Sequence, residues 1–304
     1  MEIAIIGMGT MGPGMASRMS RGGHHIRVHD VQPSAIERAK SIQPVVDTAL
    51  DGLGVIDQEG GITYCAELEE AVVGANLIIE NIPENTQIKA DLYLQLDKFI
   101  DSNVLVATNT SGIPISKLQE YITDPHRFIG MHWSNPPHII PMIEVIAGSK
   151  TDPVTVTKIQ DLIRSLNLLP VTLKKDVPGF VENRVLYALL RECVDLVEKD
   201  VIEPEDIDTC VSWGIGYKLA VIGPMRLLDM AGLDIYHSVA SFLNSDLCAR
   251  TDISPMINKV AEKGKLGMKS GGGLFEYSPE ELSSLPKERG AKLVAVRKAL
   301  EGKT

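Results

Sequence analysis

A glycine-rich hexapeptide near the start of the chain constrains its fold more than any other feature. Residues 7–12 read Gly-Met-Gly-Thr-Met-Gly, directly after an apolar run and before a helical pattern. The first glycine permits a tight turn, the second lets backbone N–H groups approach a pyrophosphate, and the third lets the helix pack closely on the strand. In this context the hexapeptide predicts a dinucleotide-binding loop. The loop residues that we expect to bind the cofactor are Gly7, Gly9, Thr10, Met11 and Gly12.

An acidic residue follows this loop at the distance that indicates the type of dinucleotide. Asp30 ends the second apolar run, eighteen residues after Gly12. A carboxylate there accepts hydrogen bonds from the adenosine ribose and repels a 2′-phosphate. We therefore expect NAD rather than NADP as the cofactor, although Arg27 lies nearby in the sequence.

Short apolar runs alternate with helical patterns through the first half of the chain, which is typical of βαβ units around a parallel sheet. From Pro178 onward the pattern is helical. The predicted fold is α/β, with a Rossmann parallel-sheet domain at residues 1–177 and an all-α domain at residues 178–304. No flexible linker separates them, so we expect the substrate between the two domains. The strand-like runs are 3–7, 25–30, 76–82, 103–108, 127–132, 143–146 and 170–174.

Composition excludes several classes of protein. The formal net charge of -10 argues against nucleic-acid binding, which requires a basic surface. The four cysteines are scattered and show no metal-ligand spacing, so we expect no metal site and a reducing compartment. The first apolar run is interrupted by glycines, so it predicts neither a signal peptide nor a membrane span. We expect a cytoplasmic protein with no membrane or nucleic-acid partner.

A histidine and a glutamate have the spacing of an acid/base pair. His132 ends one predicted strand, and Glu144, twelve residues later, lies on the next. Oxidising an alcohol by hydride loss also requires removal of the hydroxyl proton, and a histidine titrates in the range suited to that task. A carboxylate beside the ring would orient it and stabilise its protonated form. Taken singly, each residue also fits a structural role.

Several segments together resemble the 3-hydroxyacyl-CoA dehydrogenase family, in order and in spacing. The resemblance implies NAD-dependent hydride transfer, the catalytic pair His132 and Glu144, and a homodimer formed through the helical domain. The segments that carry it are Asn109-Thr110-Ser111, Gly130 to Pro136, Ile143-Glu144-Val145 and Asp176 to Arg184, with glycine-rich residues 267–273 near the end.

The same resemblance implies roles for further side chains. Ser111 and Asn183 match positions that contact the substrate oxygen, as neutral donors that polarise it. Lys269 matches a residue that closes over the cofactor, although a solvated turn fits its glycine-rich surroundings equally well. The remaining positions that match cofactor contacts are Glu84, Lys89, Asn109, Ser111 and Asn135.

One region departs from the acyl-CoA-dependent members of this family. Residues 41–88 contain no lysine or arginine and are rich in acidic residues, which opposes binding of the phosphate groups of coenzyme A. The Asn135-Pro136-Pro137 turn resembles the branch of the family that acts on small free substrates, such as gulonate and carnitine. Residues 130–141 most resemble enzymes of that branch that oxidise a formylated pyridine carboxylate, which would react as the hydrate.

Three functions are therefore compared. We expect an enzyme that oxidises a small carboxylated hydroxy or formyl compound with NAD. The first alternative is a 3-hydroxybutyryl-CoA dehydrogenase. The second is a crystallin-like protein that binds NAD without turnover. The intact His132 and Glu144 pair counts against the second alternative, because a protein without catalysis has no physical need for it.

Overall fold

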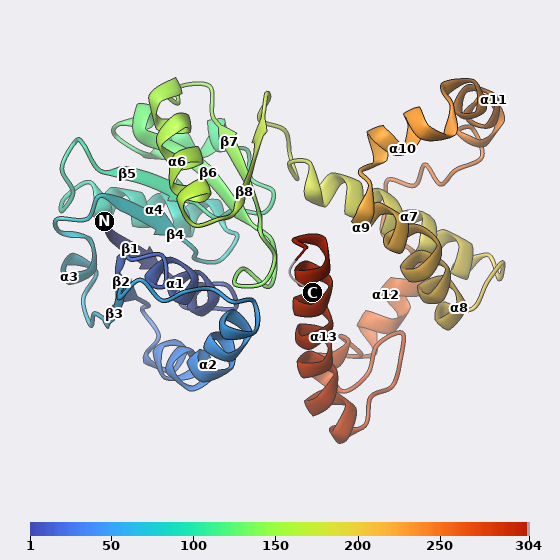
Figure 1. The fold of residues 1–304 in the computed structure, drawn as a ribbon, viewed down its shortest axis with the longest axis horizontal. Coiled ribbons are helices and arrows are strands. Elements are labelled where there is room, and N and C mark those ends of the chain that lie inside the picture. Colours follow the sequence, from blue (N-terminus) through green and yellow to red (C-terminus); the bar gives the residue numbers. More distant parts are fainter. Residues whose placement is uncertain (303–304) are drawn as a thin grey trace. The chain divides into compact units, whose positions relative to one another are not determined.

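The computed structural model describes residues 1–302, which form two compact units. The first unit is Met1–Asn183 together with Leu293–Arg297, and the second is Arg184–Lys292 together with the chain from Lys298. Figure 1 shows both units as ribbons. Within the described residues, no helix is both long and apolar enough to cross a membrane.

The first unit contains a single eight-stranded sheet with the order β3-β2-β1-β4-β5-β6-β7-β8. Each neighbouring pair is parallel except β6 and β7, which are antiparallel. Only residues 134–141 join those two strands, too few for the crossover that a parallel pair requires. The strands are β1 (Glu2–Ile6), β2 (His25–His29), β3 (Gly61–Tyr64), β4 (Leu77–Glu80), β5 (Leu105–Thr108), β6 (Phe128–Trp133), β7 (Met142–Ala147) and β8 (Leu169–Leu173).

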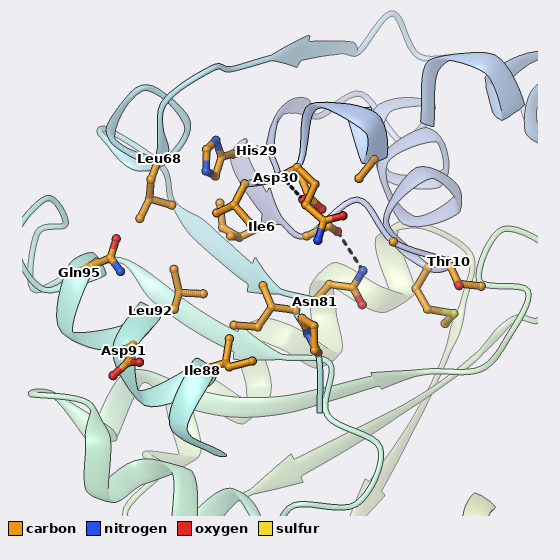
Figure 2. Close-up of a pocket in the computed structure, with 18 of the residues that line it drawn as sticks. Ile6, Thr10, His29, Asp30, Leu68, Asn81, Ile88, Asp91, Leu92 and Gln95 are labelled. Carbon is orange, nitrogen blue, oxygen red and sulfur yellow. Dashed lines mark hydrogen bonds between the residues drawn. The ribbon is translucent and has the colours of Figure 1, made fainter. Parts of the chain in front are cut away.

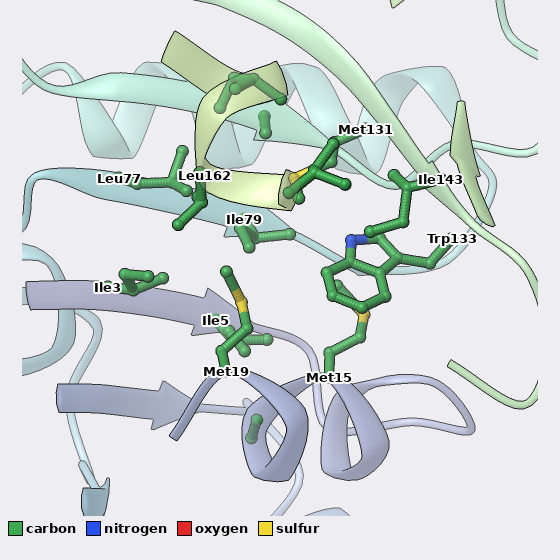
Figure 3. Packing of buried hydrophobic residues seen from close by; sticks show 14 of the residues in the cluster. Ile3, Ile5, Met15, Met19, Leu77, Ile79, Met131, Trp133, Ile143 and Leu162 are labelled. Carbon is green, nitrogen blue, oxygen red and sulfur yellow. The ribbon is translucent and has the colours of Figure 1, made fainter. Parts of the chain in front are cut away.

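Helices cover both faces of the sheet, as in other doubly wound folds. Side chains alternate along β1: Ile3 and Ile5 pack in one core with Met15 and Met19, while Ala4 packs in the other. Figure 3 shows the first core, which also contains Trp133. The Rossmann prediction is confirmed. The helices of this unit are α1 (Gly12–Ser20), α2 (Pro33–Gly52), α3 (Leu68–Val72), α4 (Thr86–Leu96), α5 (Ile115–Leu118) and α6 (Pro153–Ser165).

The second unit is helical, as predicted. Its apolar side chains are unusually exposed: α10 and α11 bury no residue, and Met225, Leu233 and Phe242 are each more than half exposed. Two of the helices also include residues of the first unit: the first two residues of α7, and Leu293–Arg297 of α13. The helices are α7 (Glu182–Glu198), α8 (Pro204–Thr209), α9 (Tyr217–Val221), α10 (Pro224–Ala231), α11 (Leu233–Leu243), α12 (Pro255–Glu262) and α13 (Pro279–Leu300), with a π-helical segment, η3 (Cys210–Gly216).

Candidate active site

The glycine loop between β1 and α1 has the geometry that its sequence predicts. Gly7 has a φ of 103°, and a Cβ there would lie 2.4 Å from the carbonyl oxygen of Asn81. A Cβ on Gly12 would lie 2.5 Å from the Gly7 oxygen, so both positions require glycine. A Cβ on Gly9 would meet nothing within 4 Å. The loop therefore leaves open space beside the N-terminus of α1, where a pyrophosphate fits.

A cavity of about 650 Å³ lies beside this loop and falls in the size range of small-molecule sites. Figure 2 shows its lining, in which Asp30 and Thr10 lie near the loop and apolar side chains such as Leu92 form the opposite wall. Gly7, Gly9 and Met11 also line it. The open loop, the acidic residue and the apolar wall fit the phosphates, ribose and adenine of a dinucleotide.

Asp30 is fixed in this cavity by backbone hydrogen bonds. Its Oδ2 accepts from the N–H of Met8 at 2.7 Å, and its Oδ1 accepts from the N–H of Gln32 at 2.8 Å. Each carboxylate oxygen retains a second lone pair for a ribose hydroxyl. Arg27 donates instead to the carbonyl oxygens of Glu70 and Val73, outside the cavity. Among the described residues that line the cavity, the cation is Arg38, which the sequence patterns did not indicate.

Replacing Asp30 by alanine is expected to narrow the preference for NAD over NADP by about 10- to 100-fold. The reason is that a hydrogen bond to a charged group contributes about 1.5–3 kcal/mol, and the bond from the adenosine ribose to Asp30 is expected with NAD but not with NADP. Fluorescence titration with both cofactors measures the change, with Asp101→Ala, an exposed aspartate, as the control. Equal affinities of the unaltered enzyme for NAD and NADP would rule out this role of Asp30.

His132 and Glu144 lie directly opposite each other on the antiparallel strands β6 and β7. The Nδ1 of His132 lies 2.8 Å from Oε2 of Glu144, and the two residues are 6% and 1% exposed. The other glutamate oxygen accepts from the N–H groups of Val181 and Glu182, at 2.9 and 3.1 Å. Because Nδ1 is bonded to Glu144, Nε2 of the ring is left to exchange a proton with a substrate.

The glutamate of this pair is held in its charged form. Burial alone would raise the pKa of Glu144, but hydrogen bonds from His132, Val181 and Glu182 outweigh burial and bring its pKa below the usual 4.5. A left-handed turn at Gly179 and Phe180, with φ of 74° and 52°, directs those two backbone N–H groups at the carboxylate. The Asp176 to Arg184 segment thus supplies the electrostatic support of the pair.

Two further predicted residues meet near the end of β5. The Nδ2 of Asn183 donates to the carbonyl oxygen of Ser111 at 2.8 Å. Asn109 accepts from the N–H of Trp133, next to His132, at 2.9 Å. Asn135 lies exposed just beyond β6. Their contacts with substrate and cofactor stay predictions.

Glu84 and Lys89 have protein partners in the structure. The Oε1 of Glu84 accepts from the N–H groups of Ser111 and Gly112, at 3.0 and 2.9 Å, and so holds the loop that carries Ser111. Its side chain is 41% exposed, whereas Lys89 is fully buried and its Nζ lies 2.6 Å from Oε1 of Glu80. Glu80 was missed in the sequence analysis, where it was counted within an apolar run. The cofactor roles of Glu84 and Lys89 stay predictions.

Lys269 lies in the second unit, on the 3-10 turn η4 (Met268–Ser270). Its contact with the cofactor stays a prediction. Glu182, which the sequence patterns did not single out, lies beside the catalytic pair. One ring nitrogen of His132 and one carboxylate oxygen each of Glu144 and Glu182 all lie within 4.8 Å of one another. Ser134 donates to Oε2 of Glu182 at 2.6 Å.

Comparisons with known proteins agree with this geometry. Residues 2–177 match the model of the 3-hydroxyacyl-CoA dehydrogenase NAD binding domain, and residues 179–277 match that of the C-terminal domain. The chain is 62% identical to the 5-formyl-3-hydroxy-2-methylpyridine 4-carboxylate 5-dehydrogenase of Mesorhizobium japonicum, over 99% of both chains. It is 33% identical to a probable 3-hydroxybutyryl-CoA dehydrogenase of Deinococcus radiodurans, over 91% of this chain and 100% of the relative.

A solved structure shares the whole fold. It is the crystal structure of a 5-formyl-3-hydroxy-2-methylpyridine 4-carboxylic acid 5-dehydrogenase, described as an NAD+ dependent dismutase. The TM-score is 0.97 and the identity is 62%, with 99% of each chain covered.

Proposed function

The chain belongs to the 3-hydroxyacyl-CoA dehydrogenase family, and on that premise we propose that it oxidises 5-formyl-3-hydroxy-2-methylpyridine-4-carboxylate, or a close carboxylated analogue, with NAD. The observation that carries the proposal is the buried 2.8 Å contact between His132 and Glu144. It lies in a chain that is 62% identical, end to end, to a relative with that activity.

In the proposed mechanism His132 accepts the hydroxyl proton of the substrate, and Glu144 stabilises the positive charge that the ring then carries. Bound NAD supplies the acceptor of the hydride that leaves the substrate carbon. His132 takes the hydroxyl proton at Nε2 as the hydride departs, and Glu144 stabilises the imidazolium from the Nδ1 side. Ser111 and Asn183 position the substrate oxygen. An aldehyde undergoes the same chemistry once it is hydrated, because the hydrate carries a hydroxyl group and a hydrogen on the reacting carbon, as an alcohol does.

We also propose that the reaction is a dismutation, as in the relative of known structure. Oxidation of one aldehyde leaves a reduced cofactor and a protonated His132. A second aldehyde then accepts hydride at its carbon and the proton of His132 at its oxygen. Two aldehydes and one water give one carboxylic acid and one alcohol, and the cofactor returns to its oxidised form.

The second candidate function is a 3-hydroxybutyryl-CoA dehydrogenase, which the match to the Deinococcus radiodurans relative favours. Charge opposes it. Residues 41–88 carry no cation. The neighbouring Arg21 is already paired with Asp47 and Asp51 on α2, so it is not available to a phosphate group. The polyanionic coenzyme A would therefore find no unpaired cation in this segment.

The pyridine aldehyde is expected to exceed 3-hydroxybutyryl-CoA in kcat/KM by at least about 100-fold. The phosphate groups of coenzyme A would lack cationic partners, and each loss of about 1.4 kcal/mol in transition-state binding lowers kcat/KM tenfold. Initial rates with the aldehyde, gulonate, carnitine and 3-hydroxybutyryl-CoA measure this ratio. A higher kcat/KM for the coenzyme A ester would favour the second candidate function.

We propose that residues 1–177 bind NAD, that residues 178–304 complete the substrate pocket and form a homodimer, and that the protein works in the cytoplasm. The four cysteines are free, as suits a reducing compartment. The exposed apolar side chains on α10 and α11 fit burial against a second copy.

Light scattering of the unaltered chain should therefore give a particle of twice 33.1 kDa. Leu233→Asp together with Phe242→Asp should shift it toward the monomer, because a charge in an apolar interface is costly to bury. A particle of 33.1 kDa at micromolar concentration would contradict the homodimer.

A further inference from the structure

Two carboxylates, not one, lie beside His132, and they differ in their contacts. Both oxygens of Glu144 are occupied, one by His132 and the other by two backbone N–H groups. Glu182 is half-buried, and its Oε2 accepts one hydrogen bond, from the hydroxyl of Ser134. An oxygen of Glu182 lies within 4.8 Å of a ring nitrogen of His132. Glu182 is thus oriented and reachable from solvent, while Glu144 is committed to the histidine.

Oxidation of the proposed aldehyde substrate requires one more proton acceptor than oxidation of an alcohol does. Oxidation of an alcohol releases one hydroxyl proton, and His132 takes it. Oxidation of an aldehyde to an acid first adds a water to the carbonyl carbon, and that water must lose a proton as it attacks. A positioned carboxylate is a suitable general base for this step. His132 cannot serve both steps as a base unless it is reset between them.

We propose that Glu182 is a second catalytic base, which activates the water that hydrates the aldehyde; this inference rests on the proposed aldehyde substrate. Glu182 takes a proton from water as the water oxygen bonds to the carbonyl carbon. The carbonyl π bond breaks, and its oxygen takes a proton from Nε2 of protonated His132. The gem-diol forms, Glu182 is left protonated, and His132 is left neutral.

The second step, hydride transfer, then begins with His132 neutral and able to accept a proton. Neutral His132 takes a hydroxyl proton of the gem-diol while hydride passes from its carbon to NAD, which gives the acid, NADH and protonated His132. Glu182 returns its proton to solvent, and in the dismutation His132, left neutral after the second aldehyde is reduced, takes one from solvent before the next hydration. The sum is aldehyde, water and NAD giving acid, NADH and one proton. Ser134 acts as a positioning residue, because its hydroxyl fixes the carboxylate through Oε2.

The rates of aldehyde oxidation and of aldehyde reduction together distinguish a catalytic role of Glu182 from a structural one. Reduction of the aldehyde by NADH needs no water and no second base, because hydride adds to the carbonyl carbon and His132 supplies the proton. Glu182→Gln should therefore slow aldehyde oxidation by about 100-fold or more, within the range of general-base assistance, and leave aldehyde reduction nearly unchanged. Ser134→Ala should show the same pattern with a smaller loss.

The experiment measures oxidation and reduction of the same aldehyde separately, as the initial rate of acid formation with excess NAD and the initial rate of alcohol formation with excess NADH. Glu120→Gln, an exposed glutamate of the same unit, is the matched control. NAD affinity of each variant reports that it is folded. Equal slowing of both directions by Glu182→Gln, or unchanged oxidation, would overturn the role of Glu182 alone. A wild-type enzyme inactive toward the aldehyde in both directions would overturn the proposed function and this inference together.

Discussion

Replacing His132 by alanine is expected to slow hydride transfer by about 10²- to 10⁴-fold, the usual contribution of a positioned general base. NAD binding should stay nearly intact, because the cavity beside the glycine loop is lined by other residues. The base is needed only as the hydroxyl proton leaves, so the loss should appear in the chemical step. Stopped-flow absorbance of NADH measures that step, with His126→Ala, an exposed histidine, as the control.

Glu144→Ala is expected to slow the same step less than His132→Ala does. Without the carboxylate, His132 still accepts a proton, but it lacks the contact at Nδ1 that orients the ring. Since the two side chains act as a unit, the double variant should be little worse than His132→Ala alone. A His132→Ala enzyme with an unchanged hydride-transfer rate would place the base elsewhere. Losses that multiply in the double variant would show that the residues act independently.

The second large effect is expected on stability. Lys89→Met should lower the free energy of unfolding by about 3–5 kcal/mol, because it leaves Glu80 without its cation in a position that is fully buried. The remaining partners of Glu80 are neutral donors: the hydroxyl groups of Tyr93 and Thr108, at 2.8 and 2.7 Å, and the N–H of Ile82, at 2.8 Å. Adding Glu80→Gln should recover part of the loss, since the uncompensated charge is then removed.

Urea denaturation measures these changes, with Lys98→Met, an exposed lysine near the end of α4, as the control. The control should change stability by no more than about 0.5 kcal/mol, as surface substitutions do. The same variants test the sequence-based assignment of Lys89 to the cofactor. A Lys89→Met protein that keeps its stability but loses NAD affinity would contradict the structural role and support the cofactor role.

The fold was largely predictable because its signals are local. Buried parallel strands are continuous apolar runs, and the run 103–108 contains β5 (Leu105–Thr108), whose residues are all buried. The strand β3 (Gly61–Tyr64) was missed because it lies at the sheet edge, is short and is only partly buried, so it lacks such a run. The antiparallel pairing of β6 and β7 depends on the length of their connection, which apolar runs do not encode.

The catalytic pair was predictable for a related reason. The eleven residues between His132 and Glu144 suffice for a strand end, a short connection and the start of a return strand, and the register places the two opposite each other. The contacts of Glu80 and Lys89 were not predictable, because they depend on how α4 packs over the sheet. Glu182 was missed for a similar reason. It adjoins His132 only because the left-handed turn at Phe180 folds the chain back onto Glu144.

Mixing the wild-type enzyme with stoichiometric NAD and the pyridine aldehyde, and following a single turnover, tests the assignment of this chain as an aldehyde-oxidising enzyme most directly. NADH absorbance and mass spectrometry of the product are measured together, with 3-hydroxybutyryl-CoA in a parallel experiment. The expected result is an early rise of NADH with the pyridine dicarboxylate as product, and any later fall of NADH should be matched by the pyridine alcohol that the dismutation forms. The coenzyme A ester should give little NADH. A burst of NADH from 3-hydroxybutyryl-CoA and none from the aldehyde would contradict it.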